Sequence, residues 1–141
     1  MLINIPNILS PGLLKVLMEM GHGDEIVIAD GNFPAASHAQ KLVRSDGHNV
    51  PDLLDAILQL FPLDTFVKQP VSLMSVVEGD NYVPLIWENY KEIIKRHDAR
   101  FVDFEMIERY VFYERARKSY AIIATSEIAR YANIILKKGL V

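Results

Sequence analysis

A short segment, 25–29, lies between a glycine-rich segment and an aspartate, and after Glu25 it is entirely apolar, with three β-branched residues in succession. Such a run predicts a buried strand. A helical pattern precedes it: Ser10-Pro11 supplies an N-cap and a first helical residue, an apolar stripe follows, and Gly21 ends the helix. Helix and strand patterns continue to alternate after residue 29, which predicts one α/β domain with a central sheet over residues 1–141.

The same alternation gives the positions of the other expected elements. Segment 51–61 is predicted to be helical because it begins with a proline and then places apolar residues on one face. Segment 101–107 is compatible with a strand, and residues 31–34 open a loop. The further predictions are a strand over 71–77, a turn over 78–81, a helix over 84–97, a charged helix over 108–119, and strands over 120–125 and 133–136.

The composition narrows the functional classes. The chain of 141 residues is half hydrophobic, carries a net charge of −3 and has no cysteine. The charge argues against a nucleic-acid binder that neutralises phosphates, and the absence of cysteine excludes disulfides, thiolate nucleophiles and cysteine-ligated zinc. The first residues lack the features of a signal peptide, and no apolar run approaches the roughly 20 residues that a membrane-spanning helix needs. We therefore expect a cytoplasmic protein that binds neither nucleic acid nor membrane.

One histidine is distinguished by its surroundings. His22 lies between Gly21 and Gly23, next to Asp24 and Glu25. Histidine is the side chain whose ordinary pKa lies closest to neutral pH, and glycines on both sides give it backbone freedom and open space. This arrangement predicts a proton-transfer site. The alternative, a structural role such as isolated histidines often have, stays open at this stage.

Other polar candidates lie at the ends of expected elements, where side chains can converge on a pocket. Asp30 follows the first strand, Arg109 begins the charged helix, and Tyr131 and Asn133 flank the last strand. Each has an ordinary alternative: Asp30 can serve a turn with Gly31, and Arg109 can belong to a solvated helix face. We assign Arg115, Arg117 and Lys118 to that face, and His38, His48 and His97 to surface or packing positions.

Metal and phosphate chemistry find no support in the motifs. His22, Asp24, Asp30 and His48 could ligate a divalent ion, but their spacing matches no known metal signature. The Gly-His-Gly segment lacks the further glycines and the lysine of a phosphate-binding loop, and no serine nucleophile elbow is present. We expect no metal and no cofactor.

Three sequence blocks occur in a characteristic order and spacing. The first is 20–27 with Ala29-Asp30, the second is Arg109 ahead of 112–116, and the third is 131–136. Together they resemble the fucose mutarotase branch of the ribose pyranase/fucose mutarotase family, over nearly the whole chain. Gly-His-Gly-Asp-Glu and Phe-Tyr-Glu-Arg-Ala are typical of the fucose branch, whereas the alanine in the third block is seen in the ribose branch.

The resemblance implies a fold, an assembly and a set of site residues. The implied fold is a three-layer α/β domain, with a central sheet flanked by helices. The implied assembly is a homo-oligomeric ring, often a decamer, that needs no cofactor. The resemblance also makes His22 the general acid and gives as substrate-binding residues Asp30, Arg109, Tyr131, Ala132, Asn133 and, more weakly, Tyr120.

Mutarotation of a monosaccharide suits these residue types. Opening the sugar ring requires a proton on the ring oxygen and loss of one from the anomeric hydroxyl, and closing reverses both transfers, so one histidine can supply and recover the proton. We therefore predict an L-fucose mutarotase. The alternatives are a D-ribose pyranase of the same family and a non-catalytic sugar-binding protein serving transport or regulation.

The spacing of the candidates also bears on assembly. A fully extended segment 25–30, at about 3.3 Å per residue, would separate His22 from Asp30 by roughly 20 Å. A monosaccharide is much smaller than that. We therefore expect a pocket between subunits, in which residues near Tyr131 and Asn133 of one chain face His22 of its neighbour.

Overall fold

The computed structural model describes residues 1–141, and they form five helices and six strands. The helices are α1 (Pro11–Glu19), α2 (Ala35–His38), α3 (Val50–Leu58), α4 (Ile86–His97) and α5 (Arg109–Lys118). The strands are β1 (Glu25–Ala29), β2 (Leu42–Ser45), β3 (Val71–Met74), β4 (Glu105–Ile107), β5 (Ala121–Thr125) and β6 (Ile134–Lys137). No helix is both long enough and apolar enough to cross a membrane.

All six strands pair in one sheet, in the order β2-β5-β1-β6-β3-β4. β6 runs antiparallel to both of its neighbours, and every other pair is parallel. The carboxyl ends of the five parallel strands therefore meet at one edge of the sheet, which we call the carboxyl edge. The opposite edge, where these strands begin and β6 ends, is the amino edge.

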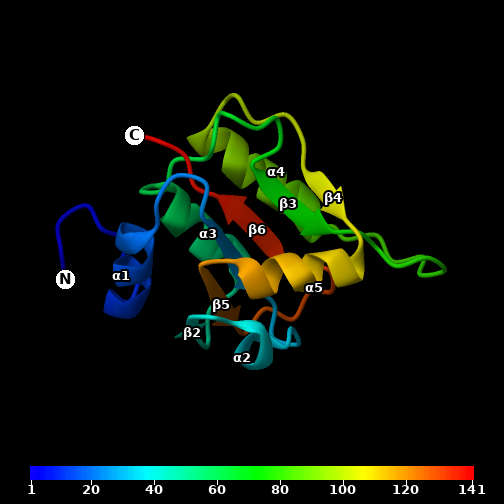
Figure 1. The fold of residues 1–141 in the computed structure, drawn as a ribbon. Coiled ribbons are helices and arrows are strands. Elements are labelled where there is room, and N and C mark those ends of the chain that lie inside the picture. Colours follow the sequence, from blue (N-terminus) through cyan, green and yellow to red (C-terminus); the bar gives the residue numbers. More distant parts are fainter.

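Helices cover both faces of the sheet (Figure 1), with α5 and the short α2 on one face and α3 and α4 on the other. The larger core, of 26 buried residues, joins the sheet to α1, α3 and α4 through side chains such as Ile26 and Ile28. The smaller core, of 11 buried residues, joins the opposite face to α2 and α5 through Val27 and Phe112. The three-layer α/β prediction is confirmed.

Side-chain caps fix where the first long helices begin. The Ser10 hydroxyl accepts the Leu13 backbone N–H at 3.1 Å, and the Asn49 side chain accepts the Asp52 N–H at 2.8 Å. A proline follows each cap within the first turn, where its missing N–H costs nothing. These local signals explain why both helices could be predicted, although the second one covers Val50–Leu58 and not 51–61.

Two of the predicted strands were too long, and two elements were not predicted at all. The strand expected over 71–77 ends at Met74, and the one expected over 101–107 covers only Glu105–Ile107. No local sequence pattern indicated α2 or β2. α2 has four residues, too few to show a helical period. β2 lies at the edge of the sheet with only Ser45 buried, so it lacks an apolar run.

Arg115 was expected on a solvated face, and this expectation was wrong. Its guanidinium forms ion pairs with Glu25 of β1 and Glu105 of β4, and its own side chain is 26% exposed. The Ser72 hydroxyl also donates to Glu105 at 2.7 Å. Burial opposes ionisation of Glu105, but the hydrogen bonds from Arg115 and Ser72 outweigh it and hold the pKa of that carboxyl below its ordinary value. Arg115 thus ties α5 to two strands.

Arg115→Ala is expected to lower the free energy of unfolding by about 2 kcal/mol, because two partly buried carboxylates lose their cation. Arg117→Ala is the matched control, since its pair with Glu114 lies on the surface, and should change stability by less than about 0.5 kcal/mol. Urea unfolding at several pH values checks both. Because the pKa of Glu105 is lowered on folding, its contribution is present at neutral pH and is lost as the pH falls through that lowered pKa. Equal stability of the two variants would contradict this role.

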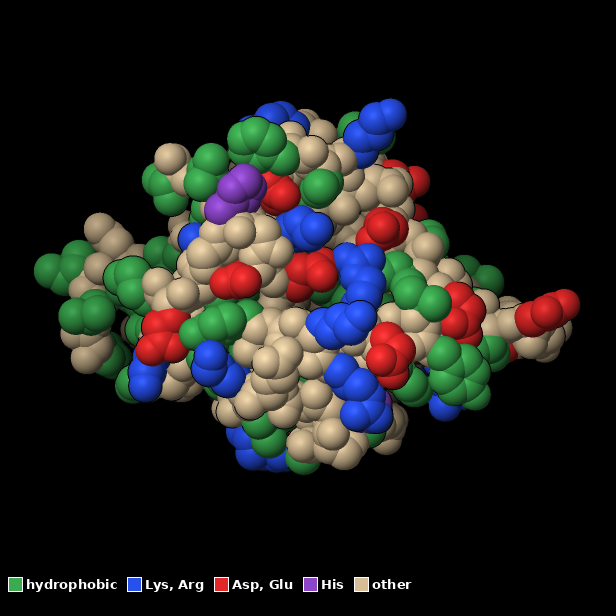
Figure 2. Space-filling model, viewed as in Figure 1, with side chains coloured by type: hydrophobic (Ala, Val, Ile, Leu, Met, Phe, Trp, Pro, Cys, Tyr) green, Lys and Arg blue, Asp and Glu red, His purple; other side chains and the backbone are tan.

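Charged groups elsewhere on this side of the molecule are mixed in sign. Figure 2 shows acidic and basic side chains interspersed over the face that α5 covers, with no continuous basic field. Such a face does not have the electrostatic pattern of a nucleic-acid-binding surface.

Candidate active site

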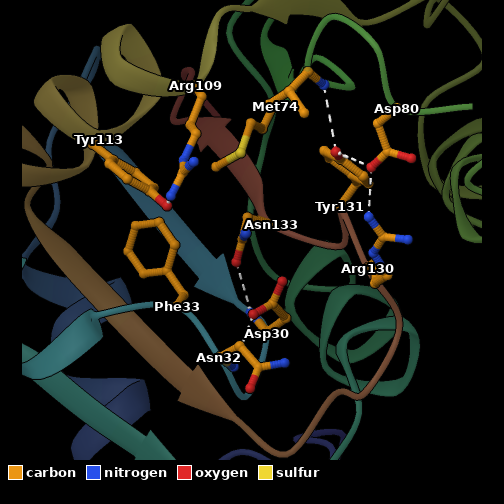
Figure 3. Close-up of a pocket in the computed structure, with 11 residues that line it drawn as sticks. Asp30, Asn32, Phe33, Met74, Asp80, Arg109, Tyr113, Arg130, Tyr131 and Asn133 are labelled. Carbon is orange, nitrogen blue, oxygen red and sulfur yellow. Dashed lines mark hydrogen bonds and ion pairs between the residues drawn. The ribbon is translucent and has the colours of Figure 1, made fainter. Parts of the chain in front are cut away.

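A cavity of about 360 Å³ opens at the carboxyl edge of the sheet. This volume is within the range of about 300–1,000 Å³ typical of small-molecule sites. Figure 3 shows polar side chains from several segments converging on it. The charged and hydrogen-bonding members are Asp30, Asn32, Asp80, Arg109, Tyr113, Arg130, Tyr131 and Asn133. Four of these eight residues, Asp30, Arg109, Tyr131 and Asn133, were predicted from the sequence as binding residues.

Asp30 and Asn133 form the floor of the cavity. The Asp30 backbone N–H donates to the Asn133 side-chain oxygen at 2.8 Å, and the Asn133 side chain also hydrogen-bonds the Asp30 carboxylate. One oxygen of the Asp30 carboxylate accepts the Asn32 N–H at 2.9 Å. Burial raises the pKa of Asp30, although this backbone hydrogen bond opposes the rise. The floor therefore offers a desolvated hydrogen-bond acceptor next to an oriented donor. Asp30 thus stabilises a turn, which was the structural alternative considered for it, and it also lines the cavity.

Arg109 stands at the mouth of the cavity, on the first turn of α5. Its Nε donates to the Tyr113 hydroxyl at 3.2 Å, and its guanidinium lies 5.4 Å from the centre of the same ring. Tyr113 in turn packs edge-on against Phe33 at 5.4 Å between ring centres. An aromatic wall therefore holds a charged donor opposite the Asp30 carboxylate.

Tyr131 has an unusual backbone conformation. Its φ is 57°, in the left-handed region that costs a bulky residue about 1–3 kcal/mol. Contacts from α4 and from the loop after β3 hold it there. Trp87 Nε1 donates to its carbonyl at 2.7 Å, and its own hydroxyl donates to Asp80 at 2.6 Å. Strain of this kind, retained by surrounding contacts, is common at binding sites.

The role of Ala132 near the cavity depends on its backbone and not on its side chain. It is fully buried, and its carbonyl accepts the Tyr90 hydroxyl at 2.7 Å. Trp87 and Tyr90 of α4 therefore hold two successive carbonyls of the segment that presents Tyr131 and Asn133. Ala132 itself does not line the cavity.

Asp80 and Arg130 were missed by the sequence analysis. Asp80 lies in the loop between β3 and α4 and pairs with Arg130. The Tyr131 hydroxyl, the Tyr82 backbone N–H and Arg130 together hold the pKa of Asp80 below its ordinary value. For Arg130, the only available signal was that it directly precedes Tyr131 in the sequence. Asp80 carried no such signal, because it is about fifty positions away from Tyr131 and was assigned to a plain turn.

His22 and Tyr120 lie at the amino edge, away from this cavity. The His22 ring Nε2 is 3.0 Å from Asp64 Oδ1, and the ring packs against Phe66 at 5.0 Å between centres. The Tyr120 hydroxyl donates to Glu19 at 2.8 Å. β1 separates His22 from Asp30. A single chain therefore brings Asp30, Arg109, Tyr131 and Asn133 together at the cavity, but it does not bring His22 or Tyr120 there.

The two acidic residues next to His22 do not contact its ring. Asp24 accepts the Gly21 N–H through its carboxylate at 2.8 Å, while Glu25 pairs with Arg115 on the sheet. Gly23 has a φ of 87°, as required at the third position of a type II turn. Asp24 and Gly23 therefore shape a turn that projects His22. The carboxylate that does contact His22 is Asp64, which no sequence pattern had singled out.

Metal ligation is not favoured by the arrangement of the side chains. No group of three or more His, Asp or Glu side chains is placed to hold a metal ion. His48 is exposed and does not line the cavity that contains Asp30.

The sequence matches the RbsD / FucU transport protein family over residues 3–141. This chain belongs to that family. It is 46% identical over 140 residues to the L-fucose mutarotase of Actinobacillus pleuropneumoniae, with 99% of this chain and 97% of the relative covered. It is 48% identical over 141 residues to the fucose mutarotase of Mus musculus, with coverages of 96% and 92%.

A solved structure of the same branch supports the fold. The fucose mutarotase of Streptococcus pneumoniae in complex with L-fucose matches this chain with a TM-score of 0.93 and 54% identity, over 99% of each chain. The predicted resemblance to the fucose branch of the RbsD / FucU family is therefore confirmed.

Proposed function

We propose that this protein is an L-fucose mutarotase that interconverts the α and β anomers by opening and closing the sugar ring. The observation that carries the proposal is the full-length similarity, at 54% identity, to a mutarotase whose structure holds L-fucose. The cavity at the carboxyl edge adds a physical reason. It combines carboxylate acceptors with guanidinium and amide donors, and such charged partners hydrogen-bond hydroxyl groups strongly.

The chemistry needs little beyond positioned proton transfer. His22, as imidazolium, donates a proton to the ring oxygen, and the anomeric hydroxyl gives its proton to a water molecule as the ring opens. Ring closure on the opposite face reverses the two transfers, and His22 recovers its proton. Asp30, Arg109 and Asn133 hold the other hydroxyls, so that only the anomeric region rearranges. Tyr131 and the Ala132 backbone support this grip, and Tyr120 takes part from the amino edge.

The working site is formed between two chains of a homo-oligomer, with the decamer as the proposed size. The cavity with Asp30 comes from one chain, and His22 comes from a neighbour. Exposed apolar side chains near His22 and in the cavity wall support burial of both places by a neighbouring chain. Phe66, beside His22, is 74% exposed, and Val77, in the cavity wall, is 37% exposed. Apolar groups at such positions are typical of subunit contacts. The protein works in the cytoplasm.

Exchange NMR tests the activity directly. We expect the protein to accelerate α/β exchange of L-fucose in chelator-treated buffer without any added cofactor. D-ribose, tested alongside, separates the pyranase alternative, and sugar binding without any exchange separates the binding-protein alternative. Unchanged exchange of L-fucose in the presence of folded protein would contradict the proposal.

Arg109→Ala is expected to weaken L-fucose binding by about tenfold or more, since a charged hydrogen bond contributes about 1.5–3 kcal/mol. Arg117→Ala lies further along the same helix on the solvated face and should bind L-fucose as the native protein does. Titration calorimetry with L-fucose measures both. If the two variants bind equally well, Arg109 does not hold the sugar.

A further inference from the structure

The hydroxyl of Tyr131 has two partners on the loop between β3 and α4. It donates to Asp80 Oδ2 at 2.6 Å and accepts the Val77 backbone N–H at 3.4 Å. Figure 3 shows the bond to Asp80 beside the cavity that both residues line. A phenolic hydroxyl has one proton to donate and two lone pairs that accept. Because Asp80 takes the proton, the hydroxyl has only acceptor capacity left for a ligand.

The surroundings of Asp80 fix the direction of this hydrogen bond. The Tyr82 backbone N–H donates to Asp80 Oδ1 at 2.9 Å, and the Arg130 guanidinium pairs with Oδ2. The Tyr131 hydroxyl, the Tyr82 N–H and Arg130 hold the pKa of Asp80 below its ordinary value, so the carboxyl group is ionised at neutral pH. An ionised carboxylate only accepts hydrogen bonds. The proton between the two side chains therefore belongs to Tyr131.

Both ends of Tyr131 are held in place. Its backbone has a φ of 57°, and Trp87 Nε1 donates to its carbonyl at 2.7 Å. Its ring packs on the Tyr82 ring, with centres 5.9 Å apart and planes tilted by 31°. The hydroxyl therefore keeps its position and its direction when a ligand enters the cavity.

The cavity thus offers a ligand two walls of opposite hydrogen-bonding character. The Arg109 guanidinium can only donate, so a hydroxyl that meets it must accept. A hydroxyl that meets Tyr131 must donate instead. A sugar hydroxyl can do either, whereas a hydrogen or fluorine atom in its place cannot donate.

We infer that Asp80 sets the hydrogen-bonding direction of Tyr131 and so makes it an acceptor that selects a donating hydroxyl of L-fucose. The inference deepens the proposed function and rests on it. Asp80 is a positioning residue, because it acts on the sugar through Tyr131. The bond to a carboxylate also polarises the phenol and makes its oxygen a stronger acceptor. A sugar without the donor is rejected because the Tyr131 oxygen then loses water without gaining a partner.

Tyr131→Phe identifies the hydroxyl concerned, because it removes the phenol oxygen and keeps the ring. L-Fucose is compared by titration calorimetry with its deoxy and deoxyfluoro analogues at C2, C3 and C4. At one carbon, the native preference for L-fucose over both analogues should be about tenfold and should fall to about threefold or less in the variant. The other two carbons should keep their native preferences. If no carbon behaves in this way, the Tyr131 hydroxyl does not touch the sugar and the inference is wrong.

The native protein then reveals the direction of the hydrogen bond. Fluorine accepts a hydrogen bond weakly and never donates one, while hydrogen does neither. At the carbon that Tyr131→Phe identifies, we expect the deoxyfluoro analogue to bind no more tightly than the deoxy analogue, because fluorine would face an acceptor oxygen. Tighter binding of the deoxyfluoro analogue at that carbon would show that Tyr131 donates, and it would overturn the inference.

Asp80→Asn should reverse the direction. Its side-chain oxygen must stay with the Tyr82 N–H, a backbone donor, so its NH₂ group faces Tyr131 and donates to it. Arg130, whose side chain is 58% exposed, can turn to solvent. The Tyr131 proton is then free to point into the cavity. We expect L-fucose to bind about threefold to tenfold more weakly, and the deoxyfluoro analogue now to bind more tightly than the deoxy analogue at the same carbon.

Glu78→Gln is the matched control, because it neutralises an exposed carboxylate of the same loop. It should keep the native affinities and the native order of the analogues. If Asp80→Asn keeps the native order, or weakens L-fucose and all analogues by one factor, Asp80 has only a structural role and the inference is wrong. Accelerated anomer exchange of L-fucose by the native protein would still uphold the proposed function in that case.

Two further outcomes are decisive. A native protein that neither binds nor interconverts L-fucose would overturn the proposed function and this inference with it. If Asp80→Asn does not fold, the analogue series with the native protein and Tyr131→Phe still decides whether Tyr131 accepts or donates.

Discussion

His22→Ala is expected to lower the rate of L-fucose anomer exchange by about 10²-fold or more, the contribution typical of a positioned proton donor. Binding of L-fucose in the cavity at the carboxyl edge should change less, because Asp30, Arg109 and Asn133 remain in place. Exchange NMR gives the rate, and calorimetry gives the affinity. A variant with near-native exchange would remove His22 from the mechanism.

The controls for this variant separate chemistry from stability. Removing the imidazole leaves the buried Asp64 with one partner fewer, which we expect to cost about 1–2 kcal/mol. His22→Gln can still donate a hydrogen bond to Asp64 but cannot transfer a proton at neutral pH. It should recover much of the stability while staying inactive. His48→Ala, at an exposed position, should match the native protein in both measurements.

Mixing two inactive variants is expected to restore activity. His22→Ala subunits keep the cavity, and Asn133→Ala subunits keep the proton donor. If each site takes its halves from different chains at random, about a quarter of the sites in an equal mixture contain both intact halves. Exchange of L-fucose should therefore rise from near zero to about a quarter of the native rate after the subunits are exchanged by mild denaturation and refolding.

The unmixed variants, treated in the same way, are the control for that experiment. Light scattering at the assay concentration should show an oligomer before and after mixing. A fully active monomer would defeat the shared site. If the subunits have exchanged but the L-fucose exchange activity does not recover, His22 and Asn133 belong to the site of the same chain.

The helices were the most predictable part of the fold, because their signals are local. Ser10 and Asn49 cap helices within three residues of themselves, so a single sequence window contains the whole pattern. β2 was missed because its position at the sheet edge removes the need for apolar residues. The ends of β3 and β4 depend on pairing with each other, which no local window shows.

The site shows the same division. Asp30, Arg109 and Asn133 could be predicted because each lies at the end of an element and in a block shared with the family. Asp64 and Asp80 could not, because their roles depend on partners in distant segments, His22 and Tyr131. The sequence offered His22 two neighbouring acids, and the structure pairs it with a third one 42 positions away.

The place of β6 in the sheet affects how the protein can be synthesised. It is the only strand that connects β2, β5 and β1 to β3 and β4. A growing chain that has not yet released Ile134–Lys137 from the ribosome therefore holds two separate groups of strands, whose facing edges expose unpaired backbone groups. The sheet can therefore be completed only after β6 has become available for pairing. A chain stalled before that point exposes unpaired strand edges, which are prone to aggregation and to chaperone binding.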